Sequence, residues 1–344
     1  MLGTSNPGKT LETGTLKMKF ATHYAPPFIA ISVLCCAPLS TLAQPYPAKA
    51  VNVIVAALPG GIADLGMRRI AQKAAEELRQ PVVIQNRSGG GGGAVGAVEV
   101  KNAAPDGYTL FMGTASTHAV NKSLIVNLPY DPIADFRPIT MLYSIPTLLA
   151  VPGKSPARNV AELVSIGKGR PGGLFFLSPG IGTASHLAGE MLKLATGLKL
   201  EHIAHKGVPQ ALTDLVAERG DLFFTSLIAA QPFLKDGRLR VLGITSQKRS
   251  SELPDVPTMS EAGYPSVEVD FWACLVAPLK TPDVVLRRLN EAFVRALASP
   301  DVIQSLAASG VTASSSTPEA LAATIVSDSA RYAKLVKEAG IRAD

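Results

Sequence analysis

The sequence predicts an α/β protein with two domains, and three observations support this prediction. Short apolar runs rich in β-formers alternate with helical patterns along almost the whole chain, which is typical of βαβ units and a parallel sheet. A length of 344 residues suits about two domains of ordinary size. With 47% hydrophobic and 17% charged residues, each domain can bury its own core, and a disordered chain is excluded.

The first series of predicted elements runs from residue 51 to residue 124. Its strands are VNVIVAA (51–57), PVVIQ (81–85) and YTLFMG (108–113). A helical pattern follows each strand. The first ends at Arg79, the second spans Ala94 to Ala104, and the third spans Thr117 to Leu124. These six elements predict the first α/β domain.

A second series begins near Leu148. Its predicted strands are LLAVP (148–152) and residues 174–178, 200–204, 221–225 and 239–246, separated by helices at 159–168, 183–196, 208–218 and 228–236. A tail follows, with a strand at 271–278 and helices at 282–298, 301–309 and 318–339. The tail is too short for a third domain. The tail is expected to pack on one of the first two domains. If it returns to the first domain, two segments of the chain cross between the domains and form a hinge.

The N-terminal segment predicts a secretory signal peptide rather than part of the fold. From Met18 a short basic start leads into an apolar stretch and then Thr-Leu-Ala before Gln44. The apolar stretch is interrupted by prolines and is too short to span a bilayer. We expect cleavage after Ala43 and a periplasmic mature protein, with Met18 as the true start. Lipid attachment at Cys35 or Cys36 is the less favoured alternative.

Charge and cysteine content narrow the functional classes. Removing residues 1–43 takes away three lysines and one glutamate, so the net charge of +6 falls to +4. Basic residues are scattered without a stripe that alternates with aromatics, so nucleic acid is not an expected partner. Cys274 would be the single cysteine left, which excludes an internal disulfide and predicts a small core residue.

Three strand-to-helix turns combine glycine with hydroxyl or acidic residues. They are LPGGIAD (58–64), GTASTHAVN (113–121) and SPGIGTASH (178–186). Open α/β sheets bind ligands at the carboxyl ends of strands, beside helix N-termini that favour anions. Each turn alone could be an ordinary tight turn with a helix cap. Three together predict an anion-binding edge.

Several segments carry a family resemblance in order and spacing. YPAKAVNVIVAALPGGIAD, QPVVIQNRSGGGG, APDGYTLFMGT, LPYDPIADFRPIT, SPGIGTASHLAGEML, DVPTMSEAGYP and KEAGI resemble the Bug-type extracytoplasmic solute-binding proteins of tripartite tricarboxylate transporters. Single motifs such as PGG are weak, but seven in register are specific. The resemblance covers about residues 45 to 344.

The resemblance implies a fold and a function. The fold would be periplasmic-binding-protein-like (type II), with domain 1 at 44–147 plus 270–344, domain 2 at 148–269, and a ligand cleft between them at a hinge. The protein would be a receptor, not an enzyme, without cofactor or metal. As a monomer, it would deliver a small organic acid to the membrane subunits of a tripartite transporter. The implied ligand-binding residues are Pro59, Gly60, Gly61, Asp64, Gly113, Thr114, Ser116, Ser178, Gly180, Gly182, Thr183 and His186.

Departures from the family pattern affect ligand specificity. Leu58 replaces an aromatic or polar residue, and His205 stands where the family has Tyr. Thr225 and Ser226 stand where Asp and Asn are common. Because Thr225 lacks the charge that would pair with a ligand ammonium, ligands without an amine are expected to bind better than amino acids. The alternative is that Thr225 faces the core and has no effect on selectivity.

Other chemistry is weighed and set aside. Residues 91–96 satisfy the pattern G-x-G-x-x-G after a strand, but five consecutive glycines satisfy almost any glycine pattern, so a nicotinamide cofactor is not expected. The histidines lack metal-ligand spacing, and His202 and His205 should point to opposite faces of a strand. Ser185 beside His186 does not form a catalytic dyad, because adjacent helical residues diverge. An exported enzyme acting on a carboxylated metabolite, or a binding protein serving a membrane sensor, are the alternative functions.

Three charged or titratable residues keep two interpretations each. Asp64 lies in the first turn of a predicted helix, where it could stabilise the dipole or accept a hydrogen bond from a ligand amine or bound water. His186 could contact a carboxylate or cap its helix. Lys206 is the cation next to a candidate loop, and a solvated surface lysine is its simpler interpretation.

Overall fold

The computed structural model describes residues 15, 17–19, 46–89, 93–250 and 252–342. The described part of the fold lies within one compact unit, residues 44–344. The predicted signal peptide therefore lies almost entirely outside the described residues, as do Gly91 and Gly92 of the glycine pattern. Within the described ranges no helix is long and apolar enough to cross a membrane.

The first sheet, called sheet A, is parallel where the sequence predicts βαβ units. Strand β1 (Val51–Val55) pairs in parallel with β2 (Val82–Asn86) and β3 (Thr109–Thr114). Helices α1 (Ile62–Leu78) and α2 (Ala94–Lys101) make the connections. Val53 packs with Met67 of α1, whereas Ile54 packs with Ala97 of α2. Helices thus cover both faces of β1, which explains its continuous apolar sequence.

Sheet A is completed by further strands whose pairing is antiparallel, in addition to the parallel pairing that the βαβ units predicted. Strand β9 (Asp270–Pro278) pairs antiparallel with β3 and with β4 (Phe136–Pro152), and β10 (Thr312–Ala313) adds to β4. The sequence predicted only residues 148–152 of β4, because its first part is interrupted by Pro138 and Pro146 and carries two register shifts. Cys274 is fully buried in β9, as expected for a core residue.

The second sheet, called sheet B, lies beside the far end of β4. Strands β5 (Leu174–Ser178), β6 (Leu200–Ala204) and β7 (Leu222–Ser226) are parallel, with β7 and β8 (Leu239–Ile244) antiparallel to β4. Helices α4 (Val160–Gly169), α5 (Ala184–Thr196), α6 (Val208–Val216) and α7 (Leu227–Lys235) connect these strands. Every helix and strand predicted in this region is present.

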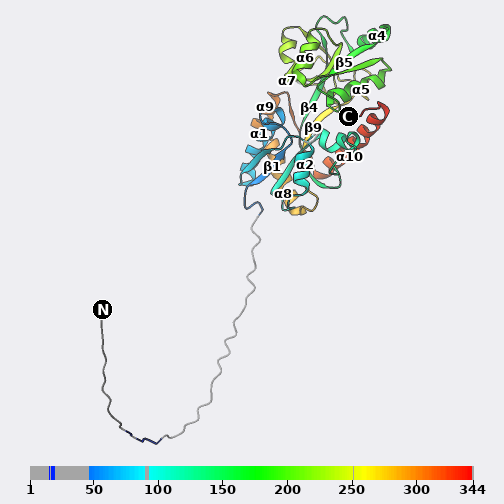
Figure 1. Cartoon of the computed structure of the whole chain (residues 1–344). Coiled ribbons are helices and arrows are strands. Elements are labelled where there is room, and N and C mark those ends of the chain that lie inside the picture. The colour runs from blue at the N-terminus through cyan, green and yellow to red at the C-terminus, as the bar shows by residue number, and fades with distance from the viewer. Residues whose placement is uncertain (1–14, 16, 20–45, 90–92, 251, 343–344) are drawn as a thin grey trace, which may run out of the picture. The chain divides into compact units, whose positions relative to one another are not determined.

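The two sheets share β4, whose pairing changes within two residues. Pro146 pairs with Asp270 in sheet A, and Thr147 pairs with Ser226 in sheet B. Thr147 Oγ1 and Thr245 Oγ1 both donate to the carbonyl oxygen of Val269, at 3.0 and 2.6 Å. Figure 1 shows β4 and β9 between the group with α4 to α7 and the group with α1, α2 and α8. The predicted domain boundaries fall at this junction and stay a prediction.

The C-terminal helices return to sheet A. Helix α8 (Asp283–Leu297) and helix α9 (Pro300–Ala307) share a core with α1. Helix α10 (Pro318–Glu338) packs on the π-helical turn Ser116–Val120 and on α3 (Asn121–Leu124), both of which follow β3. The chain therefore passes between the two sheets twice. The sequence left open whether the tail packs on the first or the second series of elements, and it packs on the first.

Candidate functional site

The predicted ligand-binding residues lie at the carboxyl ends of the central strands. In sheet A, Val55 pairs with Met112, so the turns after β1 and β3 lie at one edge. In sheet B, Leu177 pairs with Phe223, so the turns after β5 and β7 share an edge too. A Cβ built on Gly182 would lie 2.5 Å from Leu124 Cδ1. The turn after β5 therefore reaches the segment that follows β3.

Asp64 fastens the turn after β1. Its carboxylate accepts the N–H of Gly60 at 2.8 Å and the side-chain amide of Asn86 at 3.0 Å, and it pairs with Arg68 at 2.9 Å. Burial would raise the pKa of Asp64, but these hydrogen bonds outweigh it and lower the pKa below its ordinary value. The structure thus gives Asp64 a part in holding the loop, and its contact with a ligand stays a prediction.

The turn after β3 is held by Thr117. Its hydroxyl oxygen accepts the N–H of Thr114 at 2.8 Å and lies 2.9 Å from His118 Nδ1. Burial lowers the pKa of His118 to about 3, so the ring is neutral. A Cβ on Gly113 would come within 2.5 Å of this ring, so packing already requires glycine there. Ser116 is half-buried in the following turn.

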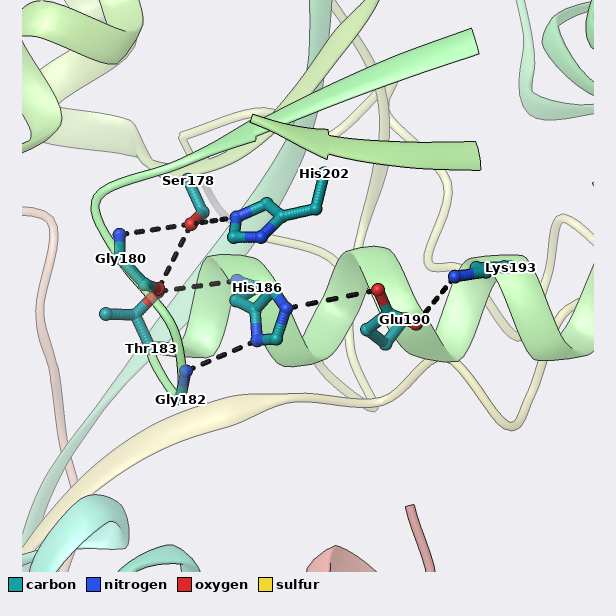
Figure 2. Close-up of polar contacts among 8 residues, drawn as sticks. All are labelled: Ser178, Gly180, Gly182, Thr183, His186, Glu190, Lys193 and His202. Carbon is teal, nitrogen blue, oxygen red and sulfur yellow. Dashed lines mark hydrogen bonds and ion pairs between the residues drawn. The ribbon is translucent and has the colours of Figure 1, made fainter. Parts of the chain in front are cut away.

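Ser178 builds the turn after β5. Its Oγ accepts the N–H of Gly180 at 3.0 Å, donates to the Gly180 carbonyl oxygen at 3.0 Å, and lies 2.6 Å from Nε2 of His202 (Figure 2). A hydroxyl has one donor and two acceptor positions, so all three are occupied when His202 carries its proton on Nε2. The pair looks like the Ser–His pair of a hydrolase, but Ser178 is fully buried and serves the loop.

Thr183 and His186 close the same turn around the start of α5. Thr183 Oγ1 donates to the Gly180 carbonyl at 2.7 Å and accepts the N–H of His186 at 3.4 Å, as a helix N-cap does. His186 Nδ1 accepts the N–H of Gly182 at 3.2 Å (Figure 2). Gly182 and Thr183 are among the implied ligand-binding residues, but the amide of Gly182 and the hydroxyl of Thr183 already donate within the loop.

In the described part of the chain, backbone N–H groups that are free to donate remain at the first two residues of α5, Ala184 and Ser185. The N–H of His186 and that of Leu187 both donate to Thr183. Among the described residues this leaves the N–H groups of Ala184 and Ser185 without a protein acceptor, as is usual in a first helical turn. Helix α1 is similar, because Leu65 donates to Gly61 while the N–H groups of Ile62 and Ala63 donate to no described acceptor. Two helices therefore present the positive ends of their dipoles at the predicted edges.

The chain matches the model for the tripartite tricarboxylate transporter family receptors, TctC, over residues 67–341. It belongs to this family. The chain is 34% identical to protein BugT of Bordetella pertussis over 316 residues, which cover 92% of this chain and 96% of BugT. BugT is thus matched over nearly its whole length.

Two similar solved structures are described with organic acids. One is described as R. palustris Rpa4515 with adipate, with a TM-score of 0.74 and 33% identity over 87% of this chain and all of the other. The other is MatC (Rpa3494) from Rhodopseudomonas palustris with bound malate, with a TM-score of 0.69 and 31% identity over 85% of this chain and all of the other. The fold of this TctC family member is the predicted two-domain α/β fold of periplasmic binding proteins.

Residues near the predicted site fall on two faces of sheet B. His202 contacts Ser178 on the α5 face, whereas His205 Nε2 lies 2.9 Å from Asp214 of α6, so the predicted divergence of the two histidines is confirmed. Lys206 is exposed. Thr225 is 2% exposed, and its hydroxyl has no described partner. It lies two residues after Phe223, which packs against α6, so its side chain is on the α6 face.

The sequence indicated His186 but not the groups that lie around it, which are His202, Phe176 and Glu190. His186 and His202 lie with their ring centroids 4.2 Å apart, and Phe176 stacks on both. Glu190 is buried one turn after His186 and 3.3 Å from Lys193. The i, i+4 spacing of His186 and Glu190 was the available signal. Among the described residues no cluster of three or more His, Cys, Asp or Glu is placed to hold a metal.

Proposed function

We propose that this TctC family member is a periplasmic receptor for a small dicarboxylate. One carboxylate binds the free N–H groups of Ala184 and Ser185 at the start of α5. The other binds at the start of α1, beside Gly60 and Gly61, so that the ligand bridges the two sheets in a cleft. The observation that carries the proposal is this pair of free helix N-termini, because backbone N–H groups and the helix dipole both favour anions.

The relatives support the chemical class of the ligand. Adipate and malate, bound in the two similar structures, each have two carboxylates. We infer that the chain is exported by a signal peptide cleaved after Ala43, acts as a monomer, catalyses no reaction, and passes its ligand to the membrane subunits of a tripartite transporter. Intact mass of the mature protein from the periplasm tests the cleavage site.

Ligand binding is expected to stabilise the mature protein. A ligand that binds only the folded state adds RT ln(1 + [L]/Kd), about 2.7 kcal/mol at a hundredfold excess over Kd. Malate, adipate and other C4 to C6 acids should therefore raise the melting temperature in a thermal-shift panel, and native mass spectrometry should identify any acid that copurifies. A panel in which sugars or cations stabilise the protein and no acid does would contradict the proposal.

A proline substitution tests the proposed carboxylate position directly. Ala184 is the first residue of α5, and Thr183 before it has φ −73° and ψ 157°, which suit a residue that precedes proline. Ala184→Pro therefore removes one N–H while the helix can keep its start. The expected loss of binding free energy is about 1.5–3 kcal/mol, the contribution of a hydrogen bond to a charged group.

The control also places a proline at the first position of another helix, where it additionally removes the exposed ion pair between Asp283 and Arg137. Asp283 is the first residue of α8, and Pro282 before it has ψ 145°. Asp283→Pro should leave the affinity unchanged, as measured by isothermal titration calorimetry with the acid that gave the largest thermal shift. Equal affinities for Ala184→Pro and the unmodified protein would place the carboxylate elsewhere.

A further inference from the structure

His186 occupies an enclosed position behind the turn after β5. The residue is 4% exposed, and the rings of His202 and Phe176 lie beside it. Phe176 is itself held against α5, because a Cβ on Gly189 would come within 2.3 Å of its ring. The imidazole therefore has little freedom to rotate away from the loop.

The hydrogen bond from the loop fixes the tautomer of His186. Gly182 donates its N–H to Nδ1, so in the neutral ring the proton is on Nε2. Nε2 faces Glu190 Oε1 at 3.9 Å, and the other Glu190 oxygen is 3.3 Å from Lys193 Nζ (Figure 2). A second proton would have to go to Nδ1, where it would meet the N–H of Gly182. Protonation of His186 is thus incompatible with the observed loop.

The direction of the Gly182 amide matters for the residues after it. Gly182 has φ +76°, a left-handed conformation that glycine adopts readily, and its N–H points inward to His186. The chain then passes through the Thr183 cap and enters α5 with the N–H groups of Ala184 and Ser185 unoccupied. If the Gly182 amide turned away, the path of the chain into α5 would change.

We propose that His186 is a positioning residue for ligand binding, and that its neutral imidazole holds the turn after β5 in the conformation that presents the start of α5 to a carboxylate. The inference rests on the proposed function for its link to the ligand, but not for the loop itself. The groups facing His186 are His202 from β6 and, on its own helix, Glu190 and Lys193. Burial and the charges of His202 and Lys193 lower the pKa of His186 to about 4, consistent with a neutral ring at pH 7.

Hydrogen exchange on the ligand-free mature protein tests the loop directly. The Gly182 amide is observed in glycine-labelled protein by NMR and is assigned by its disappearance in Gly182→Ala. We expect His186→Leu to lower its protection factor about tenfold, the equivalent of one hydrogen bond. His186→Asn, whose side-chain oxygen can accept in place of Nδ1, should keep most of the protection. Protection unchanged in His186→Leu would overturn the proposal.

The pH dependence separates positioning from general support of the fold. In the unmodified protein the protection factor of Gly182 should fall between pH 6 and pH 4, whereas in His186→Asn it should not change over this range. His205→Leu is the matched control, because His205 is also buried but contacts Asp214 on the other face of the sheet. A loss of protection at Gly182 in His205→Leu as large as in His186→Leu would also overturn it.

A binding measurement then tests the link to the ligand, with adipate and malate as probes. If the unmodified protein binds either acid, His186→Leu should bind it about tenfold more weakly and His186→Asn nearly as well as the original. Equal affinities for the unmodified protein and His186→Leu would remove the link to binding. If the unmodified protein bound neither these nor any other acid, the proposed function would fail, while the exchange result would still decide the role of His186 in the loop.

Discussion

The turns after β1 and β5 occupy equivalent places in the two sheets but are held by different chemistry. The turn after β1 is fastened by the ionised carboxylate of Asp64, and Leu58 at its start is 70% exposed. The turn after β5 is fastened by neutral groups, the hydroxyls of Ser178 and Thr183 and the ring of His186. The two turns thus have similar glycine-rich sequences but are held by different side-chain interactions.

Because their supports differ, the two turns should respond to acid at different pH values. A carboxylate with a lowered pKa stays ionised well into the acid range, so Asp64 keeps its hydrogen bonds there. His186 must stay neutral, and burial opposes its charged form. Acid should therefore loosen the turn after β5 first.

The largest expected effect is this pH dependence of stability. Burial lowers the pKa of His186 to about 4 in the folded protein, from about 6.5 in the unfolded chain, so the unfolded chain binds more protons in this window. The free energy of unfolding should fall as the pH drops through it, by about 3 kcal/mol at most from this residue. Urea unfolding from pH 7 to pH 4 measures the slope. His186→Asn should give a shallower slope, and identical slopes would contradict the assignment.

The next effect concerns the carboxylate of the turn after β1. Asp64→Ala leaves the N–H of Gly60 and the amide of Asn86 without their acceptor and should cost about 2 kcal/mol of stability at pH 7. Asp64→Asn keeps one acceptor and should cost less, because the lost ion pair with the half-exposed Arg68 contributes less than about 1 kcal/mol. Chemical denaturation compares the two, and equal losses would argue against the role of the hydrogen bonds.

The smallest effect is the loss of a helix cap in the turn after β5. Thr183→Ala removes the cap of α5 and should cost about 1 kcal/mol of stability. Thr183→Ser keeps the hydroxyl and should be close to neutral. Because the hydroxyl donates to the Gly180 carbonyl, both variants should retain most of the ligand affinity. A loss of affinity in Thr183→Ala larger than the loss of stability would restore a direct contact between this hydroxyl and the ligand.

The sequence predicted the parallel parts of the fold well because their signals are local. Apolar runs bounded by turns and followed by helical periodicity marked every strand of sheet B, and Thr183 marked the start of α5. The first part of β4 was missed because antiparallel pairing with β9 allows Pro138 and Pro146 in the strand, and neither its polar residues nor its register shifts form an alternating pattern.

The candidate site was predicted only as far as its turns. Sequence placed glycines, hydroxyls and Asp64 at strand ends, which is where they lie. It could not show that the hydroxyl groups of Ser178 and Thr183 donate to the Gly180 carbonyl, because these hydrogen bonds depend on the path of the loop. Nor could it show that His202, from the next strand, supports Ser178, since this contact joins residues 24 positions apart.

Strand β9 has a further consequence for how the chain reaches this structure. It fills the gap between β3 and β4 in sheet A, yet all of sheet B precedes it in the sequence. Until β9 arrives, β3 keeps an unpaired edge, the kind of edge that invites pairing with another chain. Sheet B can form from one continuous segment of the chain. Sheet A is complete only when β9, which is distant in sequence, pairs with β3 and β4, and such non-local pairing is slow. We expect sheet B to fold first, and a chain truncated before residue 270 to aggregate through the open edge of β3.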